Sequence, residues 1–121
     1  MKTYELSGAA LDWAVAKCEG VINGDALDVG FICEGGYTPS TNWALGGSII
    51  EREKISLIWM QFSDEQYWLA SIDKVRHEHE MFDGIDIPYE HEMRGANPLE
   101  TAMFCYVLSK LGDEVQIPEG L

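Results

Sequence analysis

Basic residues are scarce in this sequence. Among 121 residues, 8 are Lys or Arg and 21 are Asp or Glu, which gives a formal net charge of −13. A field of this sign repels the phosphates of nucleic acids and of anionic membranes unless the few bases are clustered. We therefore expect neither a nucleic acid nor a membrane as partner. The acidity favours solubility, and it would also let the protein occupy a basic groove on another protein by imitating the charge of DNA.

The sequence also has few cysteines and no long apolar run. Cys18, Cys33 and Cys105 are odd in number and widely spaced, which fits neither a disulfide framework nor a paired-cysteine zinc site. We expect reduced thiols, with Cys18 and Cys105 as small buried hydrophobes on helices. No segment approaches the roughly 20 apolar residues of a membrane span, and residues 1–5 lack the apolar core of a signal peptide. The prediction is a soluble, cytoplasmic protein.

A hydrophobic share of 46% over 121 residues is enough for one folded domain, residues 1–121. Apolar residues at helical spacing predict a first helix from residue 7 or 8 to residue 19, ended by Gly20, with Trp13 in the core. A last helix is predicted from Asn97 as cap, Pro98 at the first helical position and Gly112 as stop. Its inner face is predicted to be Leu99, Ala102, Met103, Tyr106, Val107, Lys110 and Leu111. The tail around Val115 is expected to pack back on the body.

The middle of the chain predicts strands and short elements. Residues 55–62 and 67–72 form a predicted hairpin around the turn 63–66, and alternation sends Trp68, Ala70 and Ile72 to one face. Residues 27–33 suggest a short strand. Ser48 followed by Glu51 suggests the capped start of a short helix over 48–54. Residues 74–92 are predicted to be a loop or a loosely held strand pair.

The most distinctive part is the segment of residues 37–47, called here the Tyr37 segment. Pro39 fixes its own backbone, and Ser40, Thr41 or Asn42 is placed to cap a short helix that carries Trp43. Gly46 and Gly47 allow a bend or a close approach by another group. We hypothesise a rigid pocket for a nucleotide-derived ligand, in which aromatics stack on a base, hydroxyl and amide groups meet ribose or base edges, and an arginine meets phosphate. The predicted ligand-binding residues are Tyr37, Ser40, Thr41, Asn42, Trp43, Arg52, Trp68 and Arg94.

A purely structural interpretation competes with this one. Trp43 and Trp68 would then be core anchors, and the hydroxyl residues of the Tyr37 segment would only cap a helix. We favour the structural role for Trp68 and the binding role for Tyr37 and Trp43, because aromatics in loops rich in Gly and Pro have less core to join.

Catalytic signatures are missing. The sequence has no Gly-x-Ser-x-Gly, no phosphate-binding glycine loop and no evident Cys and His pair. We predict no catalytic residues and no cofactor, with a small nucleotide hydrolase as an alternative. His77 and His79, two apart beside acids, with His91 further on, suggest a metal site, but an acidic loop with incidental histidines explains the same residues, and we predict no metal.

Three blocks together resemble the NinX-like proteins of lambdoid phages and prophages, over nearly the whole chain. They are residues 11–20 (LDWAVAKCEG), residues 37–51, and residues 97–115, which begin NPLETAM. A looser likeness is to phage domains described as an α-β-α sandwich. Asn42 and Ser48 depart from the pattern, where Asp and Pro are common. The resemblance implies a phage accessory protein in the bacterial cytoplasm, and such small proteins often act against host defence.

These observations combine into one prediction of fold and function. The fold is α+β, an antiparallel sheet of three or four strands with two main helices and a short helix after the Tyr37 segment. The function is non-catalytic binding of a nucleotide-derived ligand, which would sequester a host immune signal. The alternative is an acidic inhibitor that binds a host defence protein, indifferent to Trp43. Self-association into a homo-oligomer would be compatible with either.

Overall fold

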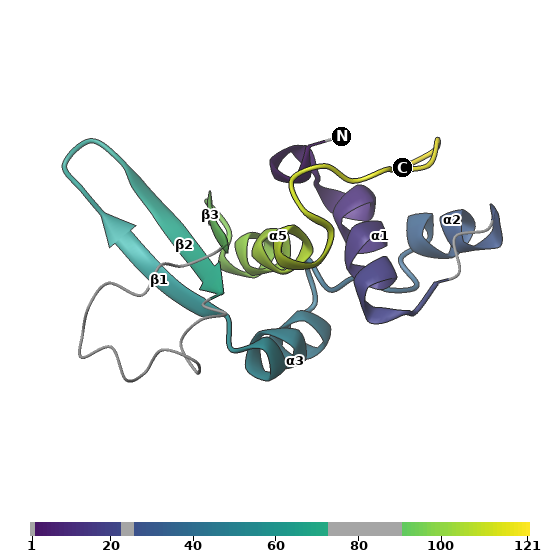
Figure 1. The fold of residues 1–121 in the computed structure, drawn as a ribbon, viewed down its shortest axis with the longest axis horizontal. Coiled ribbons are helices and arrows are strands. Elements are labelled where there is room, and N and C mark those ends of the chain that lie inside the picture. The colour runs from purple at the N-terminus through teal and green to yellow at the C-terminus, as the bar shows by residue number, and fades with distance from the viewer. Residues whose placement is uncertain (1, 23–25, 73–90) are drawn as a thin grey trace.

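The computed structural model of the chain describes residues 2–22, 26–72 and 91–121 (Figure 1). After a short 3-10 helix, η1 (Thr3–Glu5), come α1 (Gly8–Glu19), α2 (Ala26–Cys33) and α3 (Trp43–Glu53). The strands β1 (Ser56–Gln61), β2 (Gln66–Ile72) and β3 (His91–Gly95) follow, and α5 (Pro98–Leu111) ends the series. This arrangement confirms the predicted α+β class. The predicted loop or strand pair over 74–92 lies largely outside the described residues, and residues 91 and 92 belong to β3.

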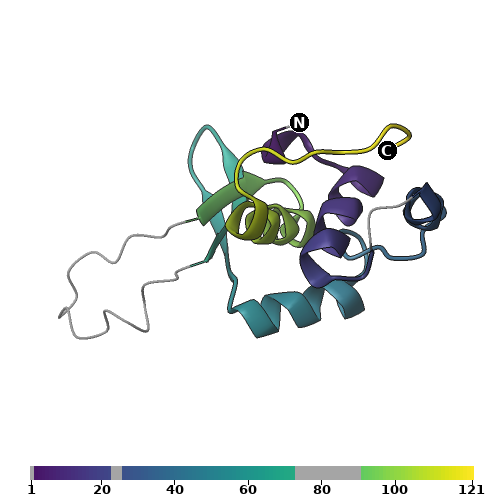
Figure 2. The ribbon, with the colours of Figure 1, turned by 45° about the vertical axis from the view of Figure 1, so that its right-hand side comes forward.

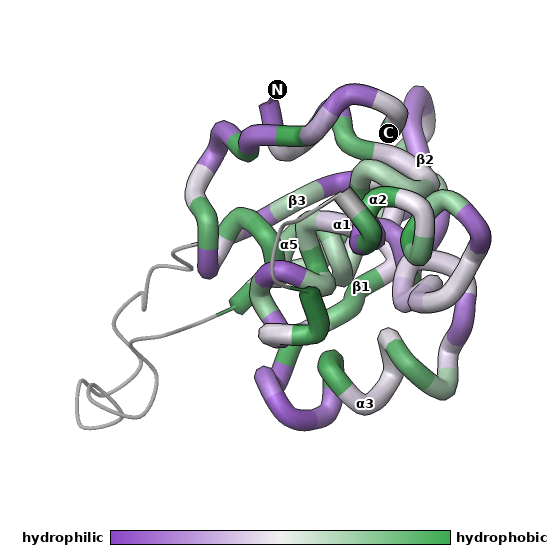
Figure 3. The backbone as a smooth tube through the Cα atoms, turned by 90° about the vertical axis from the view of Figure 1, so that its right-hand side faces the viewer, coloured by the Kyte–Doolittle hydropathy of each residue, from purple (hydrophilic) through white to green (hydrophobic). Residues whose placement is uncertain are grey.

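Helix α1 follows its sequence signals closely. Gly20 has φ 72°, a left-handed conformation that suits glycine, and its N–H donates to the carbonyls of Ala16 and Lys17. Residues 10–16 are buried continuously, and Trp13 is 2% exposed, so its predicted place in the core is confirmed. A helix buried on nearly all sides lies inside the fold, as the central position of α1 shows (Figure 3).

The strand predicted over residues 27–33 is wrong, because this segment is helix α2. Short apolar runs fit a buried strand or a helix equally well by periodicity, so packing decides. Helix α2 packs on α1, where Ile32 is buried with Trp13 and Val29 packs beside them. Leu27 and Phe31 point outward, 85% and 44% exposed.

The helix after the Tyr37 segment starts earlier than its predicted start at Ser48. Asn42 caps it, as one of the three expected residues, and the helix runs without a break from Trp43 to Glu53. Ser48 therefore lies inside α3, where its hydroxyl donates to the carbonyl of Leu45 at 2.8 Å. The Ser48 signal misled because serine also hydrogen-bonds back to its own helix.

The three strands form an antiparallel sheet in the order β1-β2-β3. Trp59 pairs with Trp68 and Leu57 with Ala70 in the hairpin, while Ala70 pairs with Met93 on the other side. The predicted face of Trp68, Ala70 and Ile72 is confirmed in part by burial, since Ala70 is fully buried and Ile72 is 7% exposed. Helix α5 packs on β2 and β3 (Figure 2).

Helix α5 connects the sheet to the other helices. Asn97 accepts a hydrogen bond from the Glu100 N–H at 3.0 Å, Pro98 occupies the first turn, and Gly112 closes the helix, all as predicted. The predicted inner face is buried as far as Val107, but Lys110 and Leu111 are exposed because the helix ends beyond the core. The core cluster joins α1, α3, β2 and α5, and the tail adds Val115, which is 6% exposed.

Candidate functional site

The Tyr37 segment is anchored on α1 by a buried hydrogen bond. The Ser40 N–H donates to the Asp12 carboxylate at 2.9 Å, and both residues are at most 5% exposed. Burial raises the pKa of Asp12, while the hydrogen bond from the Ser40 N–H acts to lower it. Tyr37 is half-buried and packs against both core clusters. The segment is therefore held in one position by contacts on both sides of its proline.

The residues that follow this anchored segment start α3 and expose an aromatic ring. Asn42 accepts the Ala44 N–H at 2.9 Å and so starts α3. Trp43 stands in the first turn of the helix with 54% of its surface exposed, and Thr41 is exposed nearby. Trp43 is thus no core anchor. In contrast, the N–H of Ser40 and the side-chain oxygen of Asn42 are used in hydrogen bonds that hold the segment in place.

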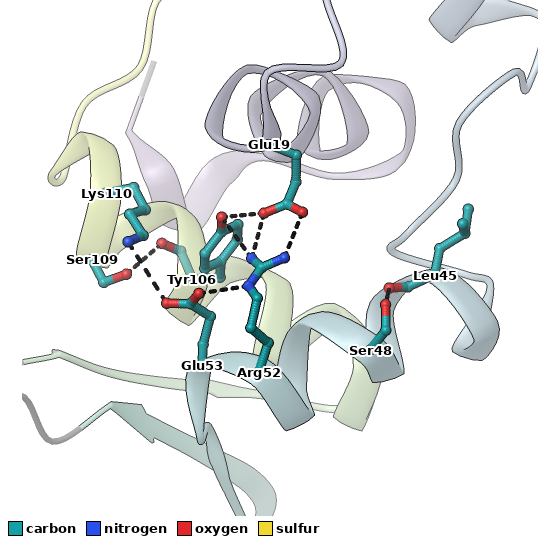
Figure 4. Close-up of polar contacts among 8 residues, drawn as sticks. All are labelled: Glu19, Leu45, Ser48, Arg52, Glu53, Tyr106, Ser109 and Lys110. Atoms are coloured by element: carbon teal, nitrogen blue, oxygen red, sulfur yellow. Dashed lines mark hydrogen bonds and ion pairs between the residues drawn. The ribbon is translucent and has the colours of Figure 1, made fainter.

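Arg52 lies at the other end of α3, in a junction of three helices (Figure 4). Its guanidinium donates to both oxygens of Glu19, at 2.9 and 2.6 Å, and to Glu53 at 2.8 Å. The Tyr106 hydroxyl donates to Glu19 and accepts from Arg52 at 3.2 Å. Lys110 lies 3.7 Å from Glu53. Two carboxylates therefore neutralise Arg52 within the protein, and the junction ties α1, α3 and α5 together.

The ionisation of the junction follows from these contacts. The hydrogen bond from Arg52 is the main cause that lowers the pKa of Glu19. Burial, with the Glu19 carboxylate beside it, raises the pKa of Tyr106, and burial raises that of Tyr37. Near neutral pH the junction thus holds an ionised carboxylate and guanidinium with a neutral phenol.

Cys18 on α1 and Cys105 on α5 are protonated thiols. Burial raises the pKa of Cys18 to about 11 and that of Cys105 to about 12. Cys105 is fully buried, as expected, while Cys18 is partly buried against the core. Neither has the lowered pKa of an activated nucleophile.

The β1–β2 hairpin carries the remaining aromatic residues. The rings of Trp59 and Trp68 lie 5.3 Å apart, and those of Phe62 and Tyr67 lie 6.2 Å apart. The Arg94 guanidinium lies over the Tyr67 ring, 4.6 Å from its centroid, which is within the range of a cation–π contact. Exposed residues of the hairpin include Ile58, Trp59, Phe62, Asp64 and Glu65, and these five are called here the hairpin surface.

The eight predicted ligand-binding residues do not gather around one point. Tyr37, Ser40, Thr41, Asn42 and Trp43 form the anchored segment. Arg52 is separated from Trp43 by roughly 14 Å of helix. Trp68 and Arg94 lie on opposite faces of the sheet, because Trp68 pairs with Gly95 and Arg94 pairs with Leu69.

Sequence reasoning missed several residues of these sites. Trp59 could have been added to the predicted residues, since it lies in the strand predicted over residues 55–62. The links of Asp12 to Ser40 and of Glu19 to Arg52 have no local signal, because they join residues 28 and 33 positions apart.

A small hollow of about 170 Å³ lies between α1 and the tail, lined by Lys17, Leu111, Glu114, Val115 and Gln116, and it contains none of the predicted residues. Among the described residues, no group of three His, Cys, Asp or Glu side chains is placed to hold a metal ion. His77 and His79 lie outside these residues. None of the helices in the described ranges has the length and apolar character to cross a membrane.

The described residues thus place an exposed tryptophan on an anchored segment, and an aromatic hairpin, on one small acidic α+β domain. The family model described as Bacteriophage P22, NinX matches residues 2–110. The chain therefore belongs to the NinX family and is a bacteriophage accessory protein. No curated protein matches it.

Proposed function

We propose that this protein acts without catalysis, in the cytoplasm of the host cell, by binding a basic surface of a host defence protein through its hairpin surface. The observation that carries the proposal is the exposure of Ile58, Trp59 and Phe62, each between 43% and 47%, on one hairpin. The hairpin projects from the helical body (Figure 1). Its tip is therefore free to enter a concave site on another protein.

The hairpin surface has the composition of an interface centre. Aromatic and arginine side chains supply most of the binding energy in protein interfaces, and they do so best when they are rigid before binding. Here the Trp59–Trp68 contact and the Arg94–Tyr67 stack hold the rings in place in the free protein. Little side-chain freedom would be lost on association.

Acidic residues border these apolar anchors. Asp64 and Glu65 are exposed in the turn of the hairpin, next to Phe62. With a net charge of −13 on the whole chain, the long-range field steers toward a positively charged partner. Arg52 does not weaken this negative field, because its charge is already paired with Glu19 and Glu53.

The test is capture of a host protein by the immobilised chain, with variants that divide the surface. Phe62→Ala and the charge reversal of Asp64 and Glu65 to Lys should each lower capture about tenfold or more. Capture should also weaken as salt rises, since the Debye length falls from about 30 Å at 0.01 M to about 10 Å at 0.1 M. Trp43→Ala is the matched aromatic control and should capture as the wild type does. Equal capture by Phe62→Ala and wild type would refute the proposal.

A nucleotide-derived ligand at the Tyr37 segment is the second candidate function. It is favoured by Trp43, whose ring is 54% exposed although the segment beneath it is fixed by Asp12. Stacking of a base on such a ring contributes about 1–3 kcal/mol, and the Thr41 hydroxyl lies close in sequence. Recognition of a phosphate group would need a basic side chain other than those of Arg52 and Arg94. Binding of this kind would sequester a host immune signal.

Thermal shift and calorimetry with cyclic dinucleotides, ADP-ribose derivatives and nicotinamide nucleotides test this second function. A ligand at 100 times its Kd stabilises the folded state by about 2.7 kcal/mol, which raises the melting temperature measurably. Trp43→Ala should abolish the shift and Phe62→Ala should leave it intact. The absence of a shift with all three classes would leave only the host protein as partner.

A further inference from the structure

The two edges of the sheet differ in chemical character. Strand β3, at one edge, has the sequence HEMRG and carries Glu92 and Arg94, charges of the kind that natural sheets use to prevent unwanted pairing. Strand β1, at the other edge, has the sequence SLIWMQ, with no charged residue, proline or glycine. In the described part of the chain, β1 pairs only with β2. One edge is thus protected against strand addition and the other is suited to it.

The hairpin register shows which backbone groups β1 offers. The Phe62 N–H donates to the Glu65 carbonyl at 2.8 Å, so this pair is hydrogen-bonded across the hairpin. Hydrogen-bonded and non-hydrogen-bonded pairs alternate in an antiparallel ladder. Gln61 opposite Gln66 and Trp59 opposite Trp68 are then non-hydrogen-bonded pairs, and the same holds for Leu57. Leu57, Trp59 and Gln61 therefore direct their N–H and C=O groups away from β2.

We propose that a second copy of this chain pairs antiparallel with β1 and joins the two three-stranded sheets into one sheet of six strands. Leu57, Trp59 and Gln61 are evenly spaced about Trp59. A two-fold axis at Trp59 therefore pairs each of their outward N–H and C=O groups with a C=O or N–H group of the second copy. Trp59 then faces the same residue of the second copy, and Leu57 faces Gln61. An isologous contact of this kind closes as a dimer and leaves β3, with its charges, at both outer edges.

The occupant is a second copy because the strand is complementary to itself. It is uncharged throughout, so antiparallel pairing brings no like charges opposite each other. The rest of each subunit is strongly acidic, and its repulsion decreases as salt screens it. Self-association should therefore strengthen with salt, whereas binding to a basic host protein weakens. Both proposals use Trp59, but their outcomes differ: the dimer strengthens with salt and depends on the backbone of Gln61, whereas binding to a host protein weakens with salt and depends on Phe62 and the acids of the turn.

Two glutamines provide matched variants for the test. Gln61 and Gln66 are opposite each other and both exposed, but their outward backbone groups point to opposite sides of the hairpin. Gln61→Pro removes an N–H from the proposed dimer edge. Gln66→Pro removes one on the other side, before the first residue of β2 that pairs with β3. Proline is tolerated at such edge positions of a folded strand. Circular dichroism checks that each variant is folded.

Sedimentation velocity is measured on the full chain at low and high salt. The wild type should sediment near twice its mass of 13.6 kDa at high salt and shift toward the monomer at low salt. Gln61→Pro should weaken the dimer about tenfold or more, because symmetry removes two hydrogen bonds, and Gln66→Pro should leave it unchanged. A wild type that stays monomeric at high salt, or equal effects of the two prolines, would overturn the proposal. If Gln61→Pro does not fold, Trp59→Lys replaces it and should give a monomer, and a dimer that persists would likewise overturn the proposal.

Discussion

The carboxylate of Glu19, at the end of α1, accepts two hydrogen bonds from the guanidinium of Arg52, near the end of α3, at 2.9 and 2.6 Å. The Glu19 side chain is only 15% exposed and that of Arg52 is 50% exposed. The pair therefore connects two helices at a position where solvent screens only one partner well. Its contribution to stability should exceed that of an ordinary surface ion pair.

Arg52→Ala should lower the free energy of unfolding by about 1–2 kcal/mol, because Glu19 then keeps the Tyr106 hydroxyl as its one hydrogen-bond partner among the described residues. Urea denaturation at neutral pH measures the loss. Lys2→Ala is the control, since Lys2 also pairs with a glutamate, Glu114 at 3.0 Å, but at an exposed site. Its loss should be clearly smaller, because both side chains of this pair are well exposed to solvent. Equal losses would show that the junction acts as any surface pair does.

The stability of the junction should depend on pH in the acid range. The folded state lowers the pKa of Glu19, mainly through Arg52, so this contribution is complete above the unfolded pKa of about 4.3. It is lost as pH falls through the lower, folded pKa. Glu19→Gln removes this titration, so the free energy of unfolding of the wild type should fall more steeply than that of the variant as pH drops below about 4.3. Parallel curves from urea titrations would contradict the expected role of Glu19.

Asp12 gives a prediction of opposite sign, because burial raises its pKa. The charged form is disfavoured in the folded state, so Asp12 costs stability as pH rises from the unfolded pKa through the folded one. Asp12→Asn keeps an oxygen for the Ser40 N–H and should be as stable as the wild type at pH 7, within about 1 kcal/mol, or more stable. Asp12→Ala leaves that N–H buried without its acceptor and should lose about 1–3 kcal/mol. Chemical denaturation of both variants at pH 7 provides the comparison, and a larger loss for Asn than for Ala would refute it.

The adjacent glycines of α3 should respond to alanine in opposite directions. A Cβ on Gly46 would lie 2.5 Å from the Pro39 carbonyl oxygen and 2.5 Å from a methyl carbon of Leu99, and the backbone oxygen has little freedom to move. Gly46→Ala should cost about 1–3 kcal/mol. A Cβ on Gly47 meets only Trp43, at 3.9 Å, so Gly47→Ala should stabilise the helix by about 0.5–1 kcal/mol. Thermal unfolding of the two variants tests this, and the same sign for both would contradict it.

Some structure was predictable because its causes are local. Asn97 and Pro98 at the start of α5, Gly20 at the end of α1, and the hairpin with its turn act within a few residues of themselves, and all lie where the sequence predicts. The family resemblance was predictable for the same reason, since it is a property of the residue order, and the NinX match confirms it.

The candidate sites were predictable only in part. The Tyr37 segment was recognised from its composition, and Asn42 caps α3 as one of three expected residues. The contacts of Arg52 and Arg94 were not predictable, because the sequence does not show whether an arginine is already engaged by a distant side chain. Their contacts with Glu19 and Tyr67 are made across different elements.

The sequence alone determined the α+β class, the antiparallel hairpin, the capped helices and the acidic charge, because these follow from neighbouring residues and from composition. Tertiary structure decided that residues 27–33 are helical, that Ser40 is fixed by Asp12, and which aromatic rings stay exposed. Each of these depends on burial against a distant segment. The free energy of such contacts appears only when the elements pack, so no local pattern in the chain encodes it.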